Sequence, residues 1–208
     1  MSRDFDVISL DLETSGSEVD RHTILSVGCV RLSDMTSFYS EVRHESFEVS
    51  PEASRIHRID LTTRDDKKLP KMAQVDENLR TWLKGSKFFK EGKRFSLIPM
   101  GMNVAAFDMK FVQKYLPKSA ALFGRRSMDL NAVLFVDALM HGHKFETTKK
   151  AAKTLGHSFA LHHVPDREAH DALFDAWSNI GVLHYVVDDV SGEGAHGRIN
   201  WEGGNLDE

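Results

Sequence analysis

The chain has 208 residues, of which 41% are apolar and 28% charged, and its formal net charge is −4 at neutral pH. This length is enough for one domain with a sizeable core and too short for two comfortable ones. A net negative charge excludes a protein that coats nucleic acid by charge alone, because such binders are usually basic. It does not exclude an enzyme whose bound metal ions reverse the local sign.

The composition is that of an ordinary soluble globular protein, with a single cysteine, Cys29, inside an apolar run. We expect Cys29 to be buried and inert, because it has no second cysteine to pair with. No apolar signal core and no stretch of membrane-spanning length is found, so we expect a cytoplasmic protein without membrane contact. One domain is expected over residues 1–190, followed by a flexible Gly-rich tail at residues 191–208.

The first strong signal is an apolar, β-branched run at residues 7–12, which predicts a buried strand with Asp11 and Glu13 near its end. Side chains at i and i+2 of a strand share a face and lie about 6 to 7 Å apart. Two such carboxylates repel each other unless a cation lies between them. Mg²⁺ and Mn²⁺ are held by a few carboxylates, and two such ions can clamp a phosphoryl group. We therefore interpret the pair as half of a two-metal site; the alternative is a solvated pair of charges.

The next segments predict a small antiparallel layer. Residues 24–32 and 37–49 are rich in β-branched and aromatic side chains, which favours two further strands. Short links to the first strand favour an antiparallel meander. Residues 52–58 are typical of a short helix, and residues 71–83 carry apolar side chains at helical spacing, which predicts an amphipathic helix.

Basic and aromatic residues alternate in residues 84–94, whose sequence is Lys-Gly-Ser-Lys-Phe-Phe-Lys-Glu-Gly-Lys-Arg. Such a segment can contact a polynucleotide backbone. The alternative is a solvated loop whose two phenylalanines pack into the core.

A second acid follows the strand predicted at residues 95–100. Asn103 is a favourable N-cap for a helix that Pro117 would stop. Asp108 then lies in the first turns of that helix, where the helix dipole favours an acid and where its side chain can reach a cleft.

The last third of the chain predicts two helices. One covers residues 147–155 and is closed by Gly156, and the other begins at residues 165–168 and carries His170 near its start and Asp175 about a turn inside. Ala172, between them, is small enough to permit close approach of a helix. Five further histidines are interpreted as loop residues, because their spacing fits no common zinc site and no cysteine accompanies them. They are His141, His143, His157, His162 and His163.

Three motifs in this order resemble the DEDDh family of exonucleases, which includes proofreading subunits of bacterial replicative polymerases, ribonuclease T and oligoribonuclease. The resemblance spans about residues 5–187. The motifs are Asp11-x-Glu13, Asn103-x-x-x-Phe107-Asp108 and His170-x-Ala172-x-x-Asp175.

The resemblance implies an α/β, ribonuclease H-like fold: a mixed central sheet of about five strands, the first three antiparallel, flanked by helices. It implies hydrolysis of phosphodiester bonds from the 3′ end with two Mg²⁺ or Mn²⁺ ions per active site. Asp11 would bridge both ions, Glu13 and Asp175 would help hold one, and Asp108 the other. His170 would take the proton from the attacking water, which suits a side chain that titrates near neutrality.

Substrate contacts are expected at four further residues: Thr14, His57, Asn103 and Phe107. The run at residues 56–59 resembles the Val-His-Gly-Ile segment of proofreading subunits, with Arg58 in place of glycine. The expected partner is the 3′ end of DNA or RNA, and a homodimer or a polymerase partner stays open. Two alternatives also stay open: a catalytically silent nucleic-acid-binding or scaffold protein on the same fold, and a trimming enzyme for very short RNA.

Overall fold

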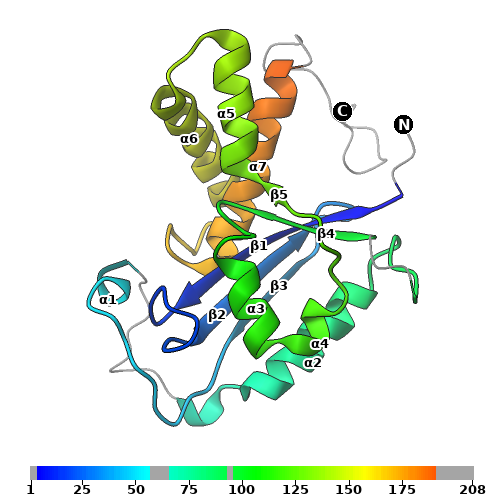
Figure 1. Cartoon of the computed structure of the whole chain (residues 1–208), viewed down its shortest axis with the longest axis vertical. Helices are drawn as coiled ribbons and strands as arrows, with labels where there is room; N and C mark the ends of the chain where they lie inside the picture. The colour runs from blue at the N-terminus through cyan, green and yellow to red at the C-terminus, as the bar shows by residue number, and fades with distance from the viewer. Residues whose placement is uncertain (1–3, 57–65, 93–95, 191–208) are drawn as a thin grey trace.

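The computed structural model describes residues 4–56, 66–92 and 96–190. In this part of the chain, five strands form one mixed sheet in the order β3-β2-β1-β4-β5. Helices cover both faces of the sheet: α5, α6 and α7 lie on one side, and α2, α3 and α4 on the other (Figure 1). The expected α/β, ribonuclease H-like fold with a mixed sheet is confirmed.

The elements follow one another along the chain in this order. The strands are β1 (Asp6–Thr14), β2 (Ile24–Arg31), β3 (Ser37–Glu41), β4 (Leu97–Gly101) and β5 (Met128–Asp129). The helices are α1 (Ala53–Ile56), α2 (Met72–Lys84), α3 (Asp108–Tyr115), α4 (Pro117–Ala120), α5 (Leu130–His141), α6 (Phe145–His163) and α7 (Ala172–Val190), with a 3₁₀ turn at Asp66–Lys68.

The first three strands form the predicted antiparallel meander, with β1 paired to β2 and β2 paired to β3. β4 joins the other edge of β1 in parallel, and β5 joins β4 in parallel. β3 is shorter than the strand predicted over residues 37–49, and it ends at Glu41. It ends because Arg43 leaves β2 and donates its backbone N–H to the carbonyl of Pro70 at 2.8 Å, beside the start of α2.

Alternation along β1 separates two hydrophobic cores. Ile8, Leu10 and Leu12 pack on the side of α2 and α3, and Val7 packs with residues of α5, α6 and α7. Successive side chains of a strand point to opposite faces, so Ser9, Asp11 and Glu13 share the face of Val7, toward α7. Cys29 of β2 is fully buried and free, as predicted.

The helix start predicted at Asn103 is wrong. Asn103 adopts a left-handed backbone conformation with φ of 58°, and α3 begins at Asp108 after a series of turns. The Asn103 side chain instead accepts a hydrogen bond from Asn131 at 2.9 Å. Asp108 is therefore the first residue of its helix.

The start of the last helix and the end of the preceding one also differ from the prediction. α7 begins at Ala172. His170 has φ of 68°, which is not helical, and the Asp171 side chain accepts hydrogen bonds from the backbone N–H groups of Leu173 and Phe174, so Asp171 caps the helix. Gly156 does not close α6, which continues to His163. An added Cβ on Gly156 would lie 2.6 Å from the carbonyl oxygen of Ser178, so this glycine lets α6 and α7 cross closely.

Four of the five histidines expected in loops lie in helices. His141 is the last residue of α5, and His157, His162 and His163 lie in α6, because α6 is longer than its apolar pattern indicated. The ring of His163 stacks on Trp177 with centroids 4.1 Å apart. Only His143 of this group lies in a connection.

The basic and aromatic segment lies beside the start of β1, away from the end that carries the acids. The hydroxyl of Ser86 donates to the buried carboxylate of Asp6. Lys87 lies over the ring of Phe88 at 5.5 Å. Asp6 and Asp11 are separated by about 17 Å along a strand. Residues 93 and 94 lie outside the described residues, as do residues 57 and 58 of the predicted short helix and residues 191–208 of the predicted tail.

No helix in the described ranges combines the length and the apolar character needed to cross a membrane.

The contact between α7 and β2 gives a test of the packing. A Cβ added to Gly28 would lie 2.1 Å from the carbonyl oxygen of Ala172, a backbone atom that cannot move aside without displacing α7. We expect Gly28→Ala to destabilise the fold by about 1 to 3 kcal/mol, which lowers the melting temperature by several degrees in thermal unfolding. Ser37→Ala, at the exposed first residue of β3, is the control. Equal melting temperatures for the two variants would contradict this account of the packing.

Candidate active site

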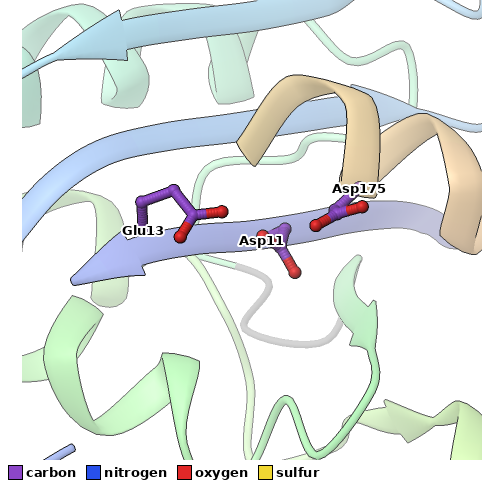
Figure 2. A group of neighbouring side chains, drawn as sticks. All are labelled: Asp11, Glu13 and Asp175. Carbon is purple, nitrogen blue, oxygen red and sulfur yellow. The ribbon is translucent and has the colours of Figure 1, made fainter. Parts of the chain in front are cut away.

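Three carboxylates converge at the end of β1. Asp11 and Glu13 extend from the strand, and Asp175 reaches them from the first turn of α7 (Figure 2). One oxygen from each side chain lies within 4.8 Å of the other two. Three oxygen donors at this separation can bind one hard divalent cation.

β1 presents Asp11 and Glu13 together because they are two residues apart on one face. Asp11 pairs with Gly28 of β2, and Glu13 pairs with Ser26. Immediately after Glu13 the register with β2 shifts, so the regular ladder ends at the acids. Such bulges occur often beside active sites, where they redirect a side chain or end the pairing.

α7 reaches the acids because β2 has no side chain opposite Asp11. The first residue of α7, Ala172, lies directly over Gly28. One turn later, the hydroxyl of Ser9 donates to the carbonyl of Ala176 at 2.6 Å. These two contacts hold the first turn of α7 against β1 and β2, which places Asp175 beside Asp11.

Asp108 approaches from the other layer of the fold. It is buried at the start of α3, and its charge is among the strongest influences on the pKa of Asp11. The carboxyl group interacts with the backbone N–H of Leu12. Asp108 thus lies beside β1 but is not one of the three acids within 4.8 Å of each other.

Burial and mutual repulsion raise the pKa values of these acids. Burial is the main cause at Glu13, where the charges of Asp175 and Asp171 add to it and the pKa reaches about 8. Burial raises the pKa of Asp108 to about 7, and raises the pKa of Asp11 well above its usual range. A cation between the carboxylates would remove this conflict, since an opposite charge favours the ionised form. The donor set therefore fits a divalent metal such as Mg²⁺ or Mn²⁺.

His170 lies at the open side of the acids. Its side chain is exposed, and its backbone N–H donates to Asp175 at 3.0 Å. Burial raises the pKa of the Asp175 carboxyl, and the hydrogen bond from His170 and the nearness of its imidazole oppose that rise. A positive φ is uncommon for a residue other than glycine and is found more often at functional sites. His170 is therefore placed next to the acids by the loop before α7.

Two residues that none of the three motifs indicated, Asp171 and Arg167, stabilise this loop. Asp171 caps α7, and its carboxylate also binds Arg167 at 2.6 Å. The guanidinium of Arg167 lies 3.9 Å from the ring centroid of Tyr39 on β3. An aspartate just before an apolar helical run is a recognised cap signal and could have identified Asp171. The contact with Tyr39 has no local sequence signal.

A pocket of about 240 Å³ adjoins Glu13. Thr14 and Phe107, two of the predicted substrate residues, line it together with Leu12 of β1 and Ala53 of α1. The Thr14 hydroxyl donates to the carbonyl of Gly16 at 2.8 Å and so supports the turn after β1.

Asn103, a third predicted substrate residue, is not among the residues that line this pocket. Asn103 is exposed in the turn after β4, where its backbone N–H donates to Asp129 at 3.2 Å. His57 lies outside the described residues. The contacts of Asn103 hold the turn between β4 and α3 against the start of α5.

No protein-family model and no curated protein sequence matches the chain. Solved structures do match. E. coli exonuclease I in complex with a dT13 oligonucleotide has a TM-score of 0.60 and 13% identity over 91% of this chain. The zinc-bound form of the E. coli complex with single-stranded DNA has a TM-score of 0.60 and 12% sequence identity over 91% of this chain. A moderately thermophilic exonuclease I from Methylocaldum szegediense has a TM-score of 0.63 and 15% sequence identity over 91% of this chain.

The chain shares the fold of part of exonuclease I. It covers 41 to 42% of the length of the exonuclease I chain in these three structures. At 12 to 15% identity the likeness establishes the arrangement of strands and helices, while residue roles rest on the chain's own site.

The raised pKa of Glu13 predicts a pH-dependent stability in the absence of metal. The pKa rises from an ordinary 4.5 to about 8 on folding, so the folded state binds more protons between these values. The free energy of unfolding therefore falls as pH rises from about 5 to 8. Thermal unfolding in EDTA should show a falling melting temperature over this range and a smaller fall for Glu13→Gln.

Addition of Mn²⁺ or Mg²⁺ at pH 8 should restore the melting temperature of the wild type more than that of Glu13→Gln. Glu45→Gln, at an exposed position, is the control and should follow the wild type. The same pH slope for Glu13→Gln and wild type in EDTA would contradict the raised pKa.

Proposed function

We propose that the chain is a metal-dependent 3′–5′ exonuclease that hydrolyses the terminal phosphodiester bond of single-stranded DNA or RNA. The observation that carries the proposal is the convergence of Asp11, Glu13 and Asp175, with His170 at its open side. The resemblance to DEDDh exonucleases and the shared fold with exonuclease I, solved with single-stranded DNA, support it.

Hydrolysis of this bond forms a P–O bond from water and breaks the bond to the 3′ oxygen of the penultimate nucleotide. The products are a nucleoside 5′-monophosphate and a strand shorter by one nucleotide. Two Mg²⁺ or Mn²⁺ ions, when held by the four acids, would lower the pKa of the attacking water and stabilise charge on the leaving oxygen. Asp11, Glu13 and Asp175 would hold one ion, and Asp108 with Asp11 would hold the second.

His170 accepts the proton of the attacking water in this proposal. A histidine imidazole has a ring nitrogen that can accept the proton of an attacking water as a general base. Exposure to solvent lets the ring pass the proton to water after each turnover. The neighbouring Asp175 carboxylate stabilises the imidazolium that forms.

The pocket beside Glu13 receives the terminal nucleotide. Phe107 offers an aromatic surface on which a base can stack, and Thr14 contributes backbone groups near the acids. Stacking is tolerant of sequence because every base has a π-face. This pocket therefore fits an enzyme that removes nucleotides one at a time without reading their identity.

The direct test is a time course with 5′-labelled single-stranded DNA and RNA of equal sequence. We expect a ladder that shortens from the 3′ end with Mg²⁺ or Mn²⁺, and no ladder with EDTA or with Asp11→Asn. Asp166→Asn, an exposed acid before α7, is the matched control and should retain activity. The faster of the two substrates shows the sugar preference.

Absence of any ladder with every metal would refute the exonuclease proposal. Internal cleavage products that appear before the ladder would identify an endonuclease instead. Activity of Asp11→Asn equal to that of the control would exclude the acidic site as the catalytic one.

The role of His170 is tested by His170→Asn. Asparagine tolerates the left-handed backbone conformation of this position, so the fold should be preserved. Loss of a general base should lower kcat by about 10² to 10⁴ and change the pH profile on its acidic side. The melting temperature in EDTA should stay within about two degrees of wild type, a shift equivalent to less than about 1 kcal/mol. A kcat within threefold of wild type would exclude His170 as the base.

A further inference from the structure

α6 carries a basic face on the surface next to the acids. Lys149, Lys153 and His157 recur every four residues, about 6 Å apart along the helix axis. Lys150 lies next to Lys149 on the same side. A shallow hollow of about 510 Å³ runs along this face, and its lining comes entirely from α6: Glu146, Lys149, Lys150, Lys153, Thr154, His157 and Ser158. We call these residues the α6 basic face.

The α6 basic face adjoins the Asp175 side of the candidate active site. Burial raises the pKa of Asp175, and the charge of Lys153 on α6 is close enough to oppose that rise. One turn further along α6, the ring of His157 packs on Phe174, the residue before Asp175, with centroids 5.1 Å apart. The crossing of α6 and α7 at Gly156 fixes this position.

The lysines of this face make few contacts within the fold. Within residues 4–56, 66–92 and 96–190, neither Lys150 nor Lys153 forms a salt bridge. Lys149 lies over the ring of Phe145 at 5.4 Å, a contact that leaves its charge at the surface. Three lysines against the single acid Glu146 form a positive surface on a chain whose net charge is −4.

The acids lie between this face and the pocket for the terminal nucleotide. The pocket adjoins Glu13, while Lys153 lies toward Asp175. Figure 2 shows Asp11 between these two acids. A strand whose last nucleotide occupies the pocket and whose terminal phosphodiester lies at Asp11 would continue past Asp175 toward α6.

We propose that the α6 basic face binds the phosphate backbone of the substrate strand on the 5′ side of the scissile bond. This inference rests on the proposed exonuclease function and assigns it a substrate-binding surface outside the pocket. Lysine ammonium groups bind phosphates as point charges without reading sequence. The face therefore selects a polyanion of several nucleotides over a dinucleotide.

The experiment measures binding of 5′-fluorescent dT10 by anisotropy across a salt series, with Mg²⁺ and in an Asp11→Asn background that prevents degradation. One variant carries Lys149→Gln, Lys150→Gln and Lys153→Gln. The matched control carries Lys84→Gln, Lys87→Gln and Lys90→Gln, the same change in charge beside the start of β1. Both variants should keep the melting temperature of the parent.

The α6 variant should bind more weakly, and its slope of log K against log salt should be shallower by about 2, since each phosphate contact on a single strand contributes about 0.7. Between 50 and 200 mM salt the parent should lose about fifteen- to twentyfold more affinity than the α6 variant. The control should follow the parent. An α6 variant with the slope of the parent, an equal loss in both variants, or a parent that binds no dT10 would overturn the proposal.

Hydrolysis separates this inference from the proposed function. With Asp11 restored, the α6 variant should raise KM for dT10 and leave kcat within twofold, with little effect on a dinucleotide. If the wild type hydrolyses nothing but the α6 variant alone loses binding, the exonuclease proposal fails and the basic face remains a nucleic-acid-binding surface. If hydrolysis proceeds and KM for dT10 is unchanged, the exonuclease stands and the α6 assignment fails.

Discussion

The close approach of α7 to β2 at Gly28 is the contact on which the candidate site depends. No side chain larger than hydrogen fits there, because the carbonyl of Ala172 already occupies the space. The hydroxyl of Ser9 fixes the next turn of α7 on β1. Together these contacts bring Asp175 to Asp11, which β1 alone could not do. If a side chain at position 28 kept α7 further from the sheet, Asp175 would lie away from Asp11 and Glu13. The two acids of β1 alone would not form a site with three oxygen donors.

The same contact brings three like-charged carboxyl groups together, and their repulsion disfavours the folded state when all three are ionised. Asp11, Glu13 and Asp175 are close together and partly or fully withdrawn from water, and each has a raised pKa. Without a cation, the conflict is relieved by protonation, so the fold and the ionised site oppose each other near neutral pH. Functional sites commonly combine burial with like charges in this way. In the proposed function, a bound metal ion would relieve this repulsion, because the carboxylates already lie close together around one point.

The two layers of helices contribute different parts of the site. The layer with α3 supplies Asp108 beside Leu12, and the layer with α6 and α7 supplies Asp175, His170 and the α6 basic face. Asp171 connects this second layer to β3, through Arg167 and Tyr39. A terminal nucleotide, its phosphodiester and the preceding backbone would thus meet a pocket, an acidic centre and a basic surface in succession. The net charge of the chain does not indicate this arrangement, because the acidic site and the α6 basic face carry opposite charges at different places on the surface.

The sequence by itself determined the features encoded within a few residues. Period-two alternation placed Asp11 and Glu13 on one face of β1, and β-branched runs with short links indicated the antiparallel meander. The order of the motifs indicated that Asp108, His170 and Asp175 belong with them. Only the tertiary structure decided the start of α7, the cap at Asp171, the extension of α6 past Gly156 and the position of Lys153 near Asp175. These features depend on contacts such as that between Ser9 and Ala176, which are 167 residues apart, and no local pattern records such a contact.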